Sequence, residues 1–139
     1  MKYFFGDERC IPPEHPDSNF GVVKKTLFPN AFPKDCTVIR MEGELSDREV
    51  AARNYEQTLP ESVDILLLSV GQDGHIDSLF PGDQALLETT RSVVSIVAPK
   101  PPPERLTITT RVIQKAKSTF LFAQANKKVR ILAEALEEP

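Results

Sequence analysis

Short apolar runs alternate with segments of helical periodicity along this 139-residue chain. The apolar runs predict strands, because they are brief, rich in β-branched and aromatic residues and bounded by turn residues. They cover residues 2–7, 37–40, 63–70, 92–98, 105–110 and 118–125. The periodic segments predict helices over 19–28, 46–59, 111–116 and 126–138. Strands that alternate with helices indicate a single α/β domain over 1–139, with a mainly parallel sheet.

Capping signals mark the starts of two of these helices. Ser18 or Asp17 can cap the helix over 19–28, and Pro29 ends it. The string SDRE at 46–49 matches a capping box and predicts Ser46 as the N-cap of the next helix. The stretch 8–18 contains three prolines and is therefore expected to be an ordered loop.

The run VDILLLSV at 63–70 is apolar almost throughout rather than alternating. This pattern is typical of a strand covered on both faces in a parallel sheet. Its apolar core, residues 65–68, is far shorter than the ~20 residues of a membrane span. No signal-peptide pattern precedes it, and we expect a cytoplasmic protein.

Polar clusters follow three of the predicted strands: GDER at 6–9, GQDGH at 71–75 and ANKK at 125–128. In open α/β sheets, ligands bind outside the carboxyl ends of the strands. Because all three clusters fall at that edge, the sequence predicts a single binding site there.

His75 is one of only two histidines and lies in the string VGQDGHIDSLFPG at 70–82. Asp73 stands two residues before it, where its carboxylate can accept a hydrogen bond from one ring nitrogen and orient the imidazole. The other nitrogen is then free to act as a general base near neutral pH. The alternative is a histidine that only hydrogen-bonds its own loop.

Two further candidates stand after the first strand. Arg9 projects from the loop and is expected to bind an anionic ligand, with a surface ion pair to Glu8 or Glu14 as the alternative. Asp7 at the strand tip is a candidate binding residue, with a simple turn contact as the alternative.

Basic residues also gather in the second half of the chain. Arg105 follows a proline-stiffened segment, which favours a well-positioned anion ligand, although a rim ion pair with Glu104 is equally compatible. The last helix has the reverse of the charge order that a helix dipole favours. Its basic residues come first and its acidic ones last: Lys127, Lys128, Arg130, then Glu134, Glu137 and Glu138. A phosphate held near Lys127 would remove this conflict.

Composition narrows the classes of function. The net charge is −3, with basic and acidic residues interspersed, so neither nucleic acid nor a membrane surface is an expected partner. Two histidines and two cysteines, Cys10 and Cys36, form no metal-ligand spacing, and no cofactor is expected. Neither a dinucleotide fingerprint, a Walker A loop nor GxSxG occurs. We expect reduced thiols, with Cys10 disfavoured as a thiolate by the acidic residues beside it.

These motifs resemble those of 6-phosphogluconolactonases, in the superfamily of sugar-phosphate isomerases and deaminases. The resemblance rests on GDER at 6–9 with the PDSNFG that follows, on VDILLLSVGQDGHIDSLFPG at 63–82 and on PKPPPERLTIT at 99–109. It implies a three-layer αβα, Rossmann-like fold. It also implies a metal-free carboxylic ester hydrolase that converts 6-phosphoglucono-δ-lactone to 6-phosphogluconate in the pentose phosphate pathway.

The resemblance assigns a role to each candidate. His75 would be the general base that activates water, and Asp73 would orient it. Arg9, Arg105 and Lys127 would bind the phosphorylated substrate, and Asp7 stays a candidate substrate-binding residue from its place at the strand tip. Backbone amides of the loop from Gly71 to Gly74 would stabilise the oxyanion.

The sequence also departs from the family pattern. Deaminases of the superfamily carry a glutamate five residues after the histidine, where this chain has Phe80. Asp77 replaces a small residue and either raises the pKa of the histidine or points to solvent. The chain resembles a family core without the glycine-rich N-terminal phosphate loop and the C-terminal end. We therefore keep open an amino-sugar deaminase, an inactive sugar-phosphate-binding fragment, and an oligomer or a completing segment.

Overall fold

The computed structural model describes residues 1–137, apart from the side chains of 125–129. Its strands are β1 (Lys2–Tyr3), β2 (Asp7–Arg9), β3 (Thr37–Val38), β4 (Ile65–Ser69), β5 (Val93–Val97), β6 (Glu104–Ile108) and β7 (Ser118–Phe122). Its helices are α1 (Asn19–Leu27), α2 (Arg48–Glu56), the short 3₁₀ helix η1 (Gln84–Leu87), α3 (Thr110–Lys115) and α4 (Ala125–Glu137). The alternation of strands and helices predicted from the sequence is present, although the first predicted strand divides into β1 and β2.

The described strands form three small sheets. β1 pairs with β3 and β4 pairs with β7, both parallel, whereas β2, β6 and β5 form an antiparallel sheet in that order. The antiparallel sheet was not expected from the sequence. Its cause is the short proline-rich segment between β5 and β6, because a parallel connection needs a crossover of a dozen residues or more.

The two helix starts differ in how well their caps were predicted. Ser18 is the N-cap of α1, as expected, and its hydroxyl accepts from the amide of Gly21. For α2, the predicted cap Ser46 is wrong. The N-cap is Asp47, whose carboxylate accepts from the amides of Glu49 and Val50. An ionised carboxylate at this position also suits the positive end of the helix dipole.

Strand β4 is less covered than its apolar sequence suggests. Leu68 is buried, but the side chains of Ile65 and Leu67 are 64% and 63% exposed. Among the described residues, β7 is the only strand that pairs with β4. The expectation of a strand covered on both faces is therefore wrong for this chain.

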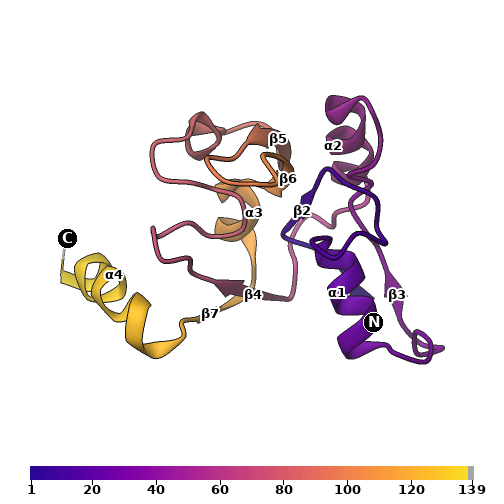
Figure 1. Cartoon of the computed structure of the whole chain (residues 1–139), viewed down its shortest axis with the longest axis horizontal. Helices are drawn as coiled ribbons and strands as arrows, with labels where there is room; N and C mark the ends of the chain where they lie inside the picture. Colours follow the sequence, from indigo (N-terminus) through magenta and orange to yellow (C-terminus); the bar gives the residue numbers. More distant parts are fainter. Residues whose placement is uncertain (138–139) are drawn as a thin grey trace.

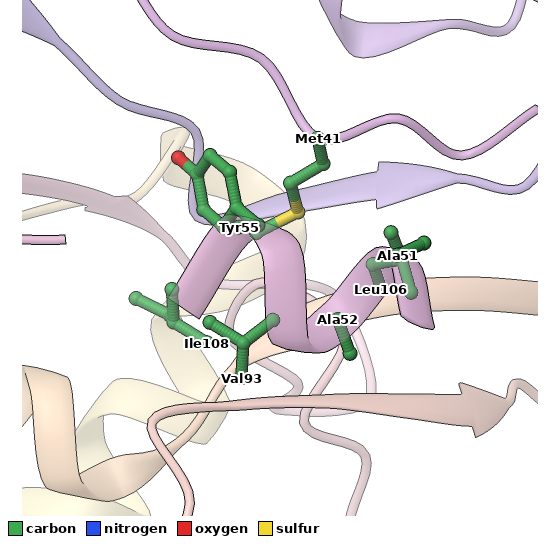
Figure 2. Close-up of a cluster of buried hydrophobic side chains, with 7 residues drawn as sticks. All are labelled: Met41, Ala51, Ala52, Tyr55, Val93, Leu106 and Ile108. Carbon is green, nitrogen blue, oxygen red and sulfur yellow. The ribbon is translucent and has the colours of Figure 1, made fainter. Parts of the chain in front are cut away.

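The main core lies between α2 and the antiparallel sheet (Figure 2). It is built from Met41, Ala51, Ala52, Tyr55, Val93, Leu106 and Ile108. The Tyr55 hydroxyl accepts from the amide of Phe5 at 2.7 Å and donates to its carbonyl at 3.0 Å. This pair of bonds fixes the segment between β1 and β2 to α2, and so positions the GDER cluster.

Figure 1 shows α1 and α2 at one end of an elongated molecule, α4 at the other, and β5, β6 and α3 between them. Among the described residues, no helix combines the length and apolar character that crossing a membrane demands.

Candidate active site

The loop that follows β4 is shaped by two glycines. A Cβ at Gly71 would lie 2.1 Å from two atoms of the His75 ring, so only glycine lets the imidazole lie against the backbone there. Gly74 has a φ of +88°, in the left-handed region that glycine adopts without strain. The Gly71 amide donates to the His75 carbonyl and the Gly74 amide to the Gly71 carbonyl. These two amides are therefore bonded within the loop, and the role of the loop amides at 71–74 toward an oxyanion stays a prediction.

His75 and Asp73 form the pair that the sequence predicted. His75 Nδ1 and Asp73 Oδ1 make a short hydrogen bond, and the His75 amide donates to the same oxygen at 3.2 Å. Burial alone would raise the pKa of Asp73, but the hydrogen bonds from His75 and the positive charge of Lys100 lower it to about 2. An ionised carboxylate can only accept, so the proton of the pair resides on Nδ1 and leaves Nε2 free as a base.

The buried ring of Phe80 gathers three of the polar groups. It stacks on the His75 imidazole with centroids 4.7 Å apart and an interplanar angle of 27°. The Arg105 guanidinium carbon lies 5.5 Å and the Lys100 amine 5.3 Å from the centre of the same ring. One aromatic ring thus lies close to a base and to two cations.

Arg105 is held in one position. It is only 3% exposed, and its Nε donates to the Pro102 carbonyl at 2.9 Å. The ion pair with Glu104 that the sequence left open does not form, because Glu104 binds Arg48 at 3.1 Å. Burial and the neighbouring charge of Arg9 both lower the pKa of Arg105. An anion bound beside it would offset both costs.

Arg9 stands directly opposite Arg105 in the pairing of β2 with β6. Its Nη1 donates to the Asp17 carbonyl at 2.6 Å and to Asn19 Oδ1 at 2.9 Å. Within the described part of the chain it forms no ion pair with either glutamate considered above, and its Nε is buried without a hydrogen-bond partner. Two adjacent guanidinium groups are suited to a dianionic ligand such as a phosphate.

Asp7 joins the loop to α1. Its Oδ1 accepts from Asn19 Nδ2 at 2.8 Å, and its Oδ2 accepts from the buried Ser78 hydroxyl at 2.6 Å. Both carboxylate oxygens are therefore used within the protein. Its predicted contact with substrate stays untested.

Asp77 does not point to solvent, which was one of the two possibilities for it. Its φ is +52°, and its carboxylate lies so close to Gly6 that a Cβ there would be 2.2 Å from Oδ1. Burial, and then the charge of Asp7, raise the pKa of Asp77 to about 7. Its Oδ2 is buried and has no hydrogen-bond partner among the described residues.

Two candidates from the sequence remain, Lys127 and Cys10. The side chain of Lys127 lies outside the described residues, although α4 itself approaches the loop: Ile131 would be 3.6 Å from a Cβ on Gly74. Burial raises the pKa of Cys10 to about 11, in spite of the nearby charge of Arg48. The expectation that Cys10 is not a reactive thiolate is confirmed in direction.

Lys100 is the site residue that sequence reasoning missed. Its Nζ lies 3.4 Å from His75 Nδ1 and 3.6 Å from Asp73 Oδ2. The only sequence signal was its place at the start of the same stiff PPP segment that precedes Arg105. Two hollows, of about 320 and 400 Å³, lie elsewhere, between α2 and α3 and beside η1.

Comparison with known proteins gives consistent matches. The whole chain, residues 1–139, matches the family described as glucosamine-6-phosphate isomerases/6-phosphogluconolactonase. It is 36% identical over 146 residues to 6-phosphogluconolactonase 3 of Saccharomyces cerevisiae, and 35% identical over 147 residues to the 6-phosphogluconolactonase of Mycobacterium tuberculosis. These alignments cover 96% of this chain, and 58% and 60% of those proteins. The chain thus spans less than two thirds of their length.

A solved structure shows the same likeness. The 6-phosphogluconolactonase of Thermotoga maritima superimposes with a TM-score of 0.87 at 26% identity, over 99% of this chain and 64% of that one. This superposition confirms the α/β fold class predicted from the sequence.

Proposed function

Because this chain belongs to the glucosamine-6-phosphate isomerase/6-phosphogluconolactonase family, we propose that it is a carboxylic ester hydrolase that converts 6-phosphoglucono-δ-lactone to 6-phosphogluconate. The observation that carries the proposal is the His75–Asp73 pair, whose imidazole stacks on Phe80 close to the buried guanidinium of Arg105. The named relatives are lactonases of this kind.

In the proposed reaction, His75 Nε2 takes a proton from water as the water oxygen bonds to the lactone carbonyl carbon. The carbonyl electron pair moves onto its oxygen, and it returns when the bond to the ring oxygen breaks. The imidazolium then gives its proton to the ring oxygen, which becomes a hydroxyl. Asp73 holds the imidazole in the required tautomer throughout.

The phosphate of the substrate is assigned to the paired guanidinium groups of Arg9 and Arg105. Lys127 is added to this set by position only, since it lies one helical turn before Ile131, which approaches the loop. No metal or cofactor has a role in the proposal.

Two alternatives are less well supported. A deaminase would require a carboxylate where Phe80 stands, and Phe80 instead stacks on the imidazole. A chain that binds sugar phosphate without turnover is the other alternative, and no contact described above favours it over the lactonase.

The assay is pH-stat hydrolysis of freshly prepared 6-phosphoglucono-δ-lactone, corrected for spontaneous hydrolysis. The chain is expected to accelerate the reaction, and His75→Gln to abolish the acceleration. His15→Gln is the matched control, because it makes the same substitution at the other histidine, whose side chain is 45% exposed. A folded chain that leaves the spontaneous rate unchanged contradicts the lactonase proposal and favours binding without turnover.

Two further proposals concern the location of this chain in the cell and the contacts of its exposed strands. We place it in the cytoplasm, where its two free cysteines, Cys10 and Cys36, would stay reduced. We also propose that a second copy or a completing segment covers β4 and β7, whose exposed apolar side chains include Leu67, Phe120 and Phe122. Sedimentation of the chain alone at a single 15.5 kDa mass would contradict self-association.

A further inference from the structure

Lys100 lies beside the proposed base, His75, but the proposed mechanism gives it no role. It follows β5 at the start of the proline-rich segment and is 44% exposed, so a ligand can reach its amine. Its Nζ lies 3.4 Å from His75 Nδ1, 3.6 Å from Asp73 Oδ2 and 5.3 Å from the centre of the Phe80 ring.

The Lys100 ammonium group has N–H groups that are free to donate to a ligand, as its two near neighbours show. His75 Nδ1 carries the proton that it donates to Asp73, so it cannot also accept from an ammonium group. The other near acceptor, Asp73 Oδ2, is at 3.6 Å, which is too long for a good hydrogen bond. Among the described residues, the ammonium group therefore keeps hydrogens to offer to a ligand.

The backbone around Lys100 is firmly placed. Arg105 Nε donates to the Pro102 carbonyl at 2.9 Å, and its Nη2 lies 3.4 Å and 3.5 Å from the carbonyls of Pro101 and Lys100. The buried guanidinium of Arg105 thus hydrogen-bonds to the proline-rich segment that begins at Lys100. The backbone that carries Lys100 is therefore fixed, which favours the preorganisation that electrostatic stabilisation of a transition state requires.

The developing oxyanion needs a hydrogen-bond donor. Of the loop amides at 71–74 that were expected to supply it, those of Gly71 and Gly74 are bonded within the loop. An ammonium group beside the base is well placed for the oxygen on the carbon that the base-activated water attacks.

We propose that Lys100 binds the C1 oxygen of the substrate: the oxyanion formed when water adds to the lactone carbonyl, and then the carboxylate of the product. This inference deepens the proposed lactonase function and rests on it. The proposed function assigns the phosphate to Arg9 and Arg105, so the C1 oxygen and the phosphate would have different partners.

The kinetic test compares Lys100→Met with Lys100→Arg. Removing one oxyanion donor is expected to lower kcat about 100-fold with KM changed less than threefold, and arginine restores part of the loss. Lys25→Met, on the exposed surface of α1, controls for a lost positive charge. A Lys100→Met enzyme that keeps its kcat, or that loses only substrate affinity, overturns the inference.

A binding test separates this inference from turnover. Calorimetry measures 6-phosphogluconate, which has a C1 carboxylate, against glucitol 6-phosphate, which has a neutral hydroxyl there. Lys100→Met is expected to weaken the first about tenfold and to leave the second unchanged. Equal effects on both ligands, no effect on either, or a wild-type chain that binds neither overturn the inference. If the wild-type chain binds both but does not hydrolyse the lactone, the proposed function fails while the ligand difference still decides the role of Lys100.

Discussion

Phe80 stacks on the imidazole of His75, with ring centroids 4.7 Å apart, and the same imidazole lies against the backbone of Gly71. Deaminases of the superfamily carry a glutamate at this position. In this chain Phe80 instead provides a flat surface, a platform, on which the imidazole of His75 stacks. Lys100 and Arg105 also lie over this ring, and Phe80 is part of a buried hydrophobic cluster. A substitution of Phe80 is therefore expected to affect both the positions of the site residues and the packing of that cluster.

Phe80→Leu is expected to lower kcat/KM about tenfold, because the imidazole loses its stacking partner and samples unproductive orientations. The free energy of unfolding should fall by only about 1 kcal/mol, since leucine fills much of the buried volume. Initial rates measure the loss of activity. The NMR shifts of the His75 ring protons measure the loss of stacking, because these protons should lose the ring-current shift that Phe80 causes. Phe32→Leu, at a partly exposed ring, is the control. Unchanged ring-proton shifts would contradict the platform role.

Asp73→Asn is expected to lower kcat at least 100-fold with little change in KM, because an amide no longer fixes the Nδ1 proton of His75. The pKa of Asp73 lies near 2, so its carboxylate stays ionised through the whole working range. Any acid limb of the wild-type rate profile between pH 4 and 8 must then come from another group. A variant in which the limb disappears while kcat is retained would refute this assignment.

Gly71→Ala is expected to abolish activity while the chain stays folded, because its Cβ would overlap the His75 ring at 2.1 Å and displace it. Circular dichroism and the lactone assay measure the two effects. Gly82→Ala is the control for the steric argument: nothing lies within 4 Å of its Cβ position, although its φ of +80°, unlike the φ of Gly71, is unfavourable for alanine. Gly82→Ala should therefore cost about 1 kcal/mol of stability and leave the rate unchanged. Equal rates in both variants would contradict the close-approach argument.

Local sequence predicted the parts of the site that depend on near neighbours. Asp73 and His75 are two residues apart, and Ser18 caps the helix that it directly precedes, so spacing alone was sufficient for both. Lys100 reaches His75 across 25 positions, through the hairpin that joins β5 to β6. Neither periodicity nor composition carries information on such a contact.

The sheet shows the same limit. A run of apolar residues predicted β4 correctly as a strand, but its coverage depends on which elements pack on it, and Ile65 and Leu67 are mostly exposed. Likewise, β-branched residues predicted β6, whereas its antiparallel direction follows from the short connection before it.

Asp77 is expected to make stability fall as pH rises. Its pKa is raised to about 7 in the folded chain, against an ordinary value of 3.8, because burial and the charge of Asp7 disfavour its ionised form. The folded state is therefore fully stable with respect to this group below pH 4, and it loses stability as the pH rises from 4 through 7.

Asp77→Asn should remove this loss, since asparagine is isosteric, cannot ionise and tolerates the φ of +52°. Relative to wild type, the variant is expected to be about equally stable at pH 4 and more stable at pH 8, by up to about 4 kcal/mol. Urea denaturation at both pH values measures the difference. The exposed Asp35→Asn serves as control. A stability difference between Asp77→Asn and wild type that is the same at both pH values would show that the buried carboxyl does not titrate near neutrality.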